Sequence, residues 1–187
     1  MKQMQGLITL LEKLANEVYK TLGDGFSEDM YQRALAFELR NKSIDYLRET
    51  NVEIFYKDQM VGLGEIDFYF PVQKNKYFSL SKPVILETKY LAKLNDSARS
   101  QLRQYLMSTK KNKTKAINKL EYGLLLNWQK EAEYDDTRTS PEEPIQIELW
   151  RYTEKICFFV NKKIFSPEKF LIFGYFVFLE PLIKKIK

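Results

Sequence analysis

Apolar residues recur at intervals of three and four along residues 1–40. Between residues 4 and 22 they are Met4, Leu7, Ile8, Leu11, Leu14, Val18 and Leu22. This spacing predicts an amphipathic helix, and Gly23 supplies its end. Ser27 is a good N-cap residue, so a second helix is expected to begin there and to run to about Arg40. The apolar stripe of that helix consists of Tyr31, Leu35 and Leu39.

From residue 51 the period of the pattern becomes two. Segments 51–56 and 60–70 flank a polar turn, which predicts an antiparallel hairpin. One face of its second strand is expected to carry Ile66, Phe68 and Phe70. The other face is expected to carry Glu65, Asp67 and Tyr69.

Residues 83–91, "PVILETKYL", predict a further strand. In it Ile85, Glu87 and Lys89 share one face, and Val84, Leu86, Thr88 and Tyr90 share the other. Asp96 is expected to cap a third helix that ends near Thr109. Residues 122–128, "YGLLLNW", are continuously apolar, as a central strand covered on both faces would be.

The last third of the chain has a different pattern. Residues 129–144 are acidic, contain prolines and show no periodicity, which predicts a loop or linker. Residues 145–152 and 155–160 are typical of another hairpin. The expected organisation is a core over 1–128, the linker, and a C-terminal extension over 145–187 packed on the core.

Composition narrows the possible chemistry. The 187 residues are 44% hydrophobic, enough for one domain with a proper core. There is no histidine, which excludes Ser-His-Asp and Cys-His catalysis and histidine-bound zinc. The single cysteine, Cys157, lies in an apolar run and is read as a small buried residue. Chemistry must therefore use carboxylates, lysine, tyrosine or a metal that prefers oxygen ligands.

Charge and apolar runs indicate the kind of partner. The net charge of +5 comes from the residues before the acidic segment and favours a polyanion. The N-terminus has no signal-peptide pattern, and the uncharged run 170–179 is about half a membrane span. We therefore expect no membrane anchor and a cytoplasmic location, or a nuclear one in a eukaryote. The aromatic C-terminal segment is a candidate homodimer interface.

Three charged residues stand in otherwise apolar strands. Asp67 lies twenty residues before Glu87, and Lys89 follows on the face of Glu87. Buried charges are costly unless they are paired or bind a metal. Two carboxylates beside an ammonium group would suit a hard cation such as Mg²⁺. An isolated Glu-x-Lys is weak evidence, and an ion pair on a half-exposed sheet face is the alternative.

A resemblance adds to this evidence. The segment "GFSEDMYQRALAFEL" resembles the signature G-x-x-E-x-x-Y-x-x-A-L-x-x-E-L of the GxxExxY family, a branch of the PD-(D/E)XK nuclease superfamily. The matched positions are Gly25, Glu28, Tyr31, Ala34, Leu35, Glu38 and Leu39. Further matches follow in the family's order: Asp67, the Glu87 and Lys89 pair, Gln101 with Tyr105 and Leu106, and Asn127. The family often has Asn-Phe-Gly at the last position, where this chain keeps only the asparagine.

The resemblance implies a restriction-endonuclease-like α/β core, with a four-stranded mixed sheet flanked by helices, and extra C-terminal strands here. It implies Asp67 and Glu87 as ligands of Mg²⁺ or Mn²⁺ and Lys89 as the catalytic lysine. Glu28 would be an accessory carboxylate facing the metal or its waters, and Gln101 a polar contact at the rim. Glu28 is also explained as a carboxylate at a helix N-terminus, and Gln101 as a residue facing solvent.

Two functions of different classes are consistent with these residues. The first is a metal-dependent nuclease, with DNA preferred over RNA. Its phosphate contacts would include Lys110, Lys111 and Lys113, which a solvated loop explains equally well. The second is a nucleic-acid-binding or scaffold protein that keeps the fold without cleaving.

Overall fold

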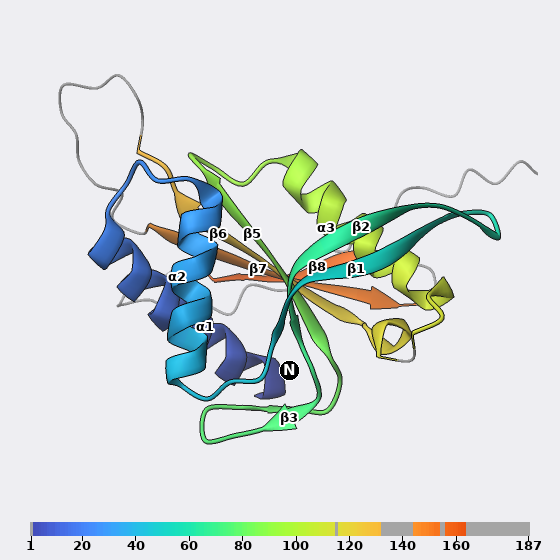
Figure 1. The fold of residues 1–187 in the computed structure, drawn as a ribbon, viewed down its shortest axis with the longest axis horizontal. Helices are drawn as coiled ribbons and strands as arrows, with labels where there is room; N and C mark the ends of the chain where they lie inside the picture. The colour runs from blue at the N-terminus through green and yellow to red at the C-terminus, as the bar shows by residue number, and fades with distance from the viewer. Residues whose placement is uncertain (1, 115, 132–143, 154–155, 164–187) are drawn as a thin grey trace, which may run out of the picture.

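The computed structural model describes residues 2–114, 116–131, 144–153 and 156–163 (Figure 1). The helices are α1 (Lys2–Leu22), α2 (Glu28–Asn41) and α3 (Asp96–Ser108), with the 3₁₀ turns η1 (Thr109–Lys111) and η2 (Ile117–Lys119). The long strands are β1 (Leu47–Tyr56), β2 (Gln59–Phe70), β5 (Val84–Leu91), β6 (Tyr122–Gln129), β7 (Ile145–Thr153) and β8 (Ile156–Lys163). Two short strands, β3 (Gln73–Lys74) and β4 (Ser79–Leu80), pair with each other.

The six long strands form one sheet in the order β1-β2-β5-β6-β7-β8. Strands β5 and β6 are parallel, and the other neighbouring pairs are antiparallel. The expected α/β class with a mixed sheet flanked by helices is confirmed. The predicted hairpins at 51–70 and 145–160 are also present, and β7 and β8 continue the sheet beyond β6.

Helices cover the sheet from both sides (Figure 1). Apolar residues of α1 and α2 form one core cluster with Val84 and Leu86 of β5. Those of α3 form a second cluster with Ile85 of the same strand. Alternate residues of β5 therefore face opposite layers, as the period of two predicts. The parallel neighbour β6 divides in the same way, with Leu124 in the first cluster and Leu125 in the second.

One prediction about the faces of β2 is wrong. Phe68 packs in the cluster under α1 and α2, whereas Ile66 packs in the cluster under α3. The reason is a change of direction between them, at Asp67. Strand β2 pairs with β5 only from Phe68 to Phe70. Opposite Asp67 on β1 lies Glu49, whose φ of 53° is in the left-handed region that interrupts a regular strand.

Beyond this point the β1–β2 hairpin leaves the main sheet and extends as a separate arm (Figure 1). Its base still rests on α3, because a Cβ on Gly64 would lie only 2.4 Å from the Tyr105 ring. The arm therefore separates from the sheet at the residue that the sequence marks as a candidate metal ligand.

The ends of the helices differ from two predictions. The cap of α3 is Asn95, whose Oδ1 accepts from the Ala98 N–H at 3.0 Å. Asp96 is instead the first helical residue. Ser27 has the extended backbone of an N-cap, but its side chain makes no capping hydrogen bond. Gly23 ends α1 as expected, with φ of 76° and its N–H bonded to the Tyr19 carbonyl.

Some expectations fall on parts of the chain outside the described residues. They are most of the acidic segment, at 132–143, the aromatic segment within 164–187, and the side chain of Cys157. Among the helices that are described, none has a stretch apolar enough to span a bilayer. The compartment stays a prediction.

Candidate active site

The site is built where the start of α2 meets the centres of β2 and β5. Glu28 is the first residue of α2, Asp67 lies on β2, and Glu87 and Lys89 lie on β5. The Lys89 ammonium is 3.5 Å from Glu28 Oε1. The Asp67 N–H donates to Glu87 Oε1 at 3.4 Å. The structure thus brings together four residues that span 61 positions of the chain, from Glu28 to Lys89.

Asp67 is held by the residue between Glu87 and Lys89. Its Oδ2 accepts from the Thr88 N–H at 2.7 Å and from the Thr88 hydroxyl at 2.9 Å. The Asp67 carboxylate can point across β5 because regular pairing between β2 and β5 ends at Phe68 and Leu86. The irregularity that places Ile66 on the other face also gives Asp67 this contact.

Glu28 bonds to β5 as well as to Gln32 of its own helix, whose amide donates to Glu28 Oε1 at 3.5 Å. Its Oε2 accepts from the Tyr90 N–H at 3.2 Å, and its Oε1 faces Lys89. A carboxylate that served only the helix N-terminus would have no need of either contact. The position of Glu28 therefore fits the site reading better than the cap reading.

Aromatic contacts fix the turn that carries Glu28. Gly25 has a φ of 100°, and its N–H donates to the Tyr90 hydroxyl at 2.7 Å. The Tyr31 ring stacks between Tyr90 and Trp128, with centroids 4.9 and 5.4 Å away. The Tyr31 hydroxyl donates to the Gly23 carbonyl at 2.6 Å. The glycine and the tyrosine of the signature thus set the path of the chain into α2.

The charge balance at the site is incomplete. Glu87 is fully buried, and its Oε2 atom has no hydrogen-bond partner. Burial raises the pKa of the Glu87 carboxyl well above its ordinary value, and Asp67 raises it further, while Lys89 acts in the opposite direction. Burial likewise raises the pKa of Glu28 against the lowering effect of Lys89. The site has more negative charge than its one lysine offsets.

This arrangement fits a hard divalent cation. Such an ion prefers oxygen ligands, and it stabilises buried carboxylates in their ionised form. Oε2 of Glu87 has no hydrogen-bond partner, and the other oxygen, Oε1, accepts from the Asp67 N–H. Within the described residues, no three His, Cys, Asp or Glu side chains form a ready metal cluster. The pair Asp67 and Glu87 is therefore the donor set that the geometry offers.

A comparison with known families agrees with this geometry. A family model described as the PD-(D/E)XK nuclease superfamily matches residues 5–139. The chain belongs to the PD-(D/E)XK nuclease superfamily. Membership implies a hydrolase of phosphodiester bonds with nucleic acid as substrate, and this superfamily generally uses divalent metals. No curated protein and no solved structure matches the chain significantly.

Gln101 is not bonded to the acidic group of this PD-(D/E)XK chain. Its amide donates to the Tyr105 hydroxyl at 3.1 Å on the same helix, α3. Among the described residues, no hydrogen bond joins it to Asp67, Glu87 or Lys89. Tyr105 in turn packs on Gly64 of β2. A role at the rim of the site stays a prediction.

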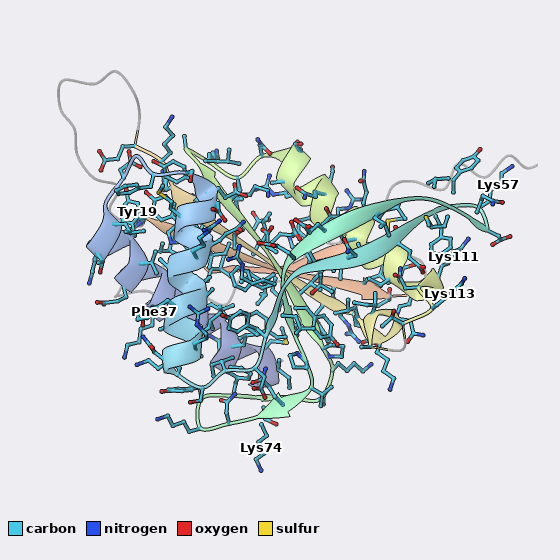
Figure 2. The ribbon with its side chains drawn as sticks, in the orientation of Figure 1. Tyr19, Phe37, Lys57, Lys74, Lys111 and Lys113 are labelled. Atoms are coloured by element: carbon cyan, nitrogen blue, oxygen red, sulfur yellow. The ribbon has the colours of Figure 1, made fainter. Side chains whose placement is uncertain are left out.

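The three predicted lysine contacts lie apart from the acidic group. Figure 2 shows Lys57 at the free end of the β1–β2 arm, with Lys111 and then Lys113 below it. The Lys113 N–H donates to Glu53 Oε2 of β1 at 3.3 Å. The Lys111 ammonium donates to the Lys57 carbonyl and lies 3.2 Å from Asp58. The Lys110 ammonium is 3.5 Å from the Asn118 carbonyl. These lysines belong to the arm and the turns beside it.

Sequence reasoning missed two residues of the site. Gln32 is almost fully buried, and its amide donates to the Thr88 hydroxyl at 2.8 Å. Its signal was its position four residues after Glu28, which places both on one side of α2. Thr88 was assigned to the apolar face of β5, and only the turn at Asp67 brings a carboxylate to it.

Asn127 of the nuclease motif has a structural role. Its side chain is fully buried and bonds to the backbone of Leu91, accepting from the N–H and donating to the carbonyl, both at 2.9 Å. It thereby fastens the end of β5, two residues beyond Lys89, to β6.

Proposed function

We propose that the protein is a divalent-metal-dependent nuclease of the GxxExxY branch, with DNA as its preferred substrate. The observation that carries the proposal is the buried Glu87 Oε2 atom, which has no hydrogen-bond partner although Asp67 and Lys89 both act on this carboxyl. A carboxylate left in this state is costly to a fold unless something binds it. The GxxExxY assignment is supported by the match at Gly25, Glu28 and Tyr31, each with a contact that shapes the site.

Asp67 and Glu87 would hold Mg²⁺ or Mn²⁺, with Glu28 facing the ion or its water shell. When bound, such an ion lowers the pKa of water and offsets charge on the leaving oxygen. Water attacks phosphorus, a new O–P bond forms, and the bond to the leaving sugar oxygen breaks. That oxygen takes a proton from solvent, and the products are a phosphate monoester and a free hydroxyl.

Lys89 is the residue that would stabilise the transition state. Its side chain is 16% exposed, and Glu28 holds its ammonium at 3.5 Å. A fixed positive charge in a partly dry site stabilises developing negative charge on phosphate oxygens more than a mobile one in water would. Glu28 would therefore keep Lys89 directed toward the scissile phosphate, and the Tyr90 N–H would keep Glu28 in place.

The direct test is cleavage of single-stranded, duplex and branched DNA and of RNA, with Mg²⁺, Mn²⁺ or EDTA. We expect metal-dependent cutting that Lys89→Ala lowers by about 10²–10³-fold, the usual effect of removing one electrostatic group from an active site. Lys93→Ala is the matched control, because Lys93 is an exposed lysine just beyond β5. A wild-type protein that binds DNA but cuts no substrate would support the scaffold function instead.

The lysines beside the arm are proposed to contact substrate phosphates outside the cutting site. Support comes from the position of Lys111 and Lys113 beside the arm whose free end carries Lys57 (Figure 2). Each lost phosphate contact lowers the magnitude of the slope of the logarithm of the binding constant against the logarithm of salt concentration by about 0.7–0.9. DNA-binding titrations across salt concentrations should therefore give Lys113→Ala a shallower slope, and an unchanged slope would remove Lys113 from the interface.

A further inference from the structure

Behind Asp67 lies a chain of hydrogen bonds that connects three elements. Arg48 of β1 donates from Nη2 to Gln32 Oε1 at 3.4 Å. Gln32 of α2 donates from Nε2 to Thr88 Oγ1 at 2.8 Å, and Thr88 of β5 donates to Asp67 Oδ2 at 2.9 Å. Gln32 and Thr88 are both buried. None of these three supporting residues belongs to the acid-and-lysine motif.

Donor and acceptor chemistry gives this chain one direction. A guanidinium has donors only, so the Gln32 atom that faces Arg48 must be its oxygen. The Gln32 nitrogen then faces Thr88 and donates a hydrogen bond to a lone pair of its hydroxyl oxygen. A hydroxyl has a single hydrogen, and the acceptor available to it is Asp67 Oδ2. Each residue thus fixes the hydrogen-bond geometry of the next.

Arg48 is itself well anchored. Its guanidinium lies 5.8 Å from the centroid of the Phe68 ring, and its Nη2 contacts Glu49 at 2.9 Å and Asp29 at 3.5 Å. Its side chain is 22% exposed. Arg48, the first residue of this hydrogen-bond chain, therefore contacts the same kink that turns Asp67 toward β5, because its partner Glu49 is the residue of the kink with a positive φ.

We infer that Gln32 and Thr88 are positioning residues, which hold the Asp67 carboxylate at one oxygen and leave its other oxygen for a divalent cation. The inference rests on the proposed function. Oδ2 accepts two hydrogen bonds, from the Thr88 N–H and from its hydroxyl, and no described residue donates to Oδ1. Outer-shell hydrogen bonds of this kind orient carboxylate ligands, and removing one typically costs about 10–100-fold in metal affinity.

Two substitutions distinguish the effect of the Thr88 hydroxyl from the effect of the volume of the side chain. Thr88→Val keeps the shape of the side chain and loses the hydroxyl's hydrogen bonds to Gln32 and Asp67, while the Thr88 N–H still donates to Asp67 Oδ2. Thr88→Ser keeps the hydroxyl and loses a methyl group. Gln32→Leu removes the support of the hydroxyl, and Gln104→Leu is its matched control on the exposed side of α3. Asp67→Asn serves as the reference for loss of the ligand.

The measurement is Mn²⁺ affinity, from the electron paramagnetic resonance signal of free Mn²⁺ in titrations of the full chain. Near-ultraviolet circular dichroism in EDTA first establishes that each variant is folded. We expect Asp67→Asn to lose binding and Thr88→Val and Gln32→Leu to bind about tenfold more weakly. Thr88→Ser and Gln104→Leu should bind close to wild type. The double variant Gln32→Leu/Thr88→Val should bind about as weakly as Thr88→Val alone, because the shorter contact of the Gln32 amide is to the Thr88 hydroxyl at 2.8 Å, against 3.5 Å to Glu28 Oε1.

Three results would overturn the inference. If Thr88→Val binds Mn²⁺ as wild type does while Asp67→Asn does not, Asp67 needs no support and the proposed function still stands. If Thr88→Val and Thr88→Ser lose affinity equally, the loss does not follow the hydroxyl, and the packing of the Thr88 side chain matters instead. If Asp67→Asn binds as wild type does, the metal site of the proposed function is wrong and the positioning role falls with it.

Discussion

Two buried glutamates on the same sheet differ in how many hydrogen-bond partners their carboxylates have. Glu148 of β7 is 2% exposed and receives the Arg99 guanidinium on both oxygens, at 2.8 to 3.2 Å, and the Trp150 indole N–H at 3.1 Å. Glu87 of β5 is fully buried and has one weak backbone hydrogen bond, with its second oxygen unpartnered. Both belong to one sheet, separated only by β6.

The difference separates a charge that is satisfied within the fold from one that is left available for the proposed metal. Arg99 and Glu148 complete each other, and the pairing raises the pKa of Arg99 despite its partial burial. A satisfied buried pair fastens α3 to the sheet and has no capacity for a ligand. The unsatisfied Glu87 keeps that capacity, at a cost in stability that the fold carries without a ligand. Burial alone therefore does not identify a site, whereas a buried carboxylate oxygen without a partner, close to a second carboxylate, points to one.

The largest expected effect comes from making Glu148 resemble Glu87. Arg99→Met leaves the Glu148 carboxylate buried without its partner and should lower the free energy of unfolding by about 3–5 kcal/mol. Urea denaturation followed by circular dichroism measures this change. Adding Glu148→Leu should recover most of the loss, since a buried apolar pair replaces a buried ion pair at little cost. If the double variant is no more stable than Arg99→Met, the pair does not act as described.

The second test concerns the unsatisfied carboxyl group of Glu87, which Glu87→Gln removes. Because the pKa of Glu87 is raised in the folded state, the native protein holds this proton at a pH where the unfolded chain has lost it. The free energy of unfolding in EDTA should therefore fall as pH rises above the ordinary value of about 4.3, by about 1.4 kcal/mol for each unit of pKa shift, until pH passes the folded-state pKa.

Glu87→Gln should remove this loss of stability between acidic and neutral pH. It should also remove the stabilisation of wild type by Mn²⁺ at neutral pH, since the amide is a poor replacement for an anionic ligand. Thermal denaturation across pH, with and without Mn²⁺, measures both effects. A variant with the same pH profile as wild type would show that Glu87 does not titrate as its burial implies.

The smallest expected effect concerns the turn that delivers Glu28 to the same site. Gly25 has a φ of 100° with open space where a Cβ would be, so Gly25→Ala introduces backbone strain and no clash. We expect a loss of about 1–2 kcal/mol in the free energy of unfolding and weaker Mn²⁺ stabilisation. Gly62→Ala is the control, because that glycine also has open space and lies on the arm. Equal effects at the two glycines would contradict a special role for the turn.

The sequence predicted most of the elements because period and burial agree in them. In β5 the alternation places Leu86 and Ile85 in opposite core layers, as expected. It could not predict the reversal at Ile66, because that depends on where β2 stops pairing with β5 and on the conformation of Glu49, which are tertiary properties. The cap at Asn95 was missed because an Asn-Asp pair offers two capping residues, and only the backbone decides between them.

The candidate site follows the same division. Asp67, Glu87 and Lys89 were recognisable as charges in apolar strands, and the structure brings them together. The direction of Glu28 was open in the sequence, because a carboxylate at this position suits a helix terminus equally well. Thr88 gave no distinct signal, since a threonine in a strand is an ordinary residue, and Gln32 gave only its spacing of four residues from Glu28. Their importance depends on distances across three elements.

The kink opposite Asp67 also separates what can vary in this protein from what cannot. Because β2 leaves β5 there, the hydrogen bonds of residues 50–66 are made mainly within the arm, and those of the site are made outside it. Insertions or deletions of residue pairs near the arm's turn would preserve its register and leave the catalytic geometry unchanged. The arm is thus a segment whose length can change without moving the candidate site, and the proposed phosphate contacts of its lysines would change with it.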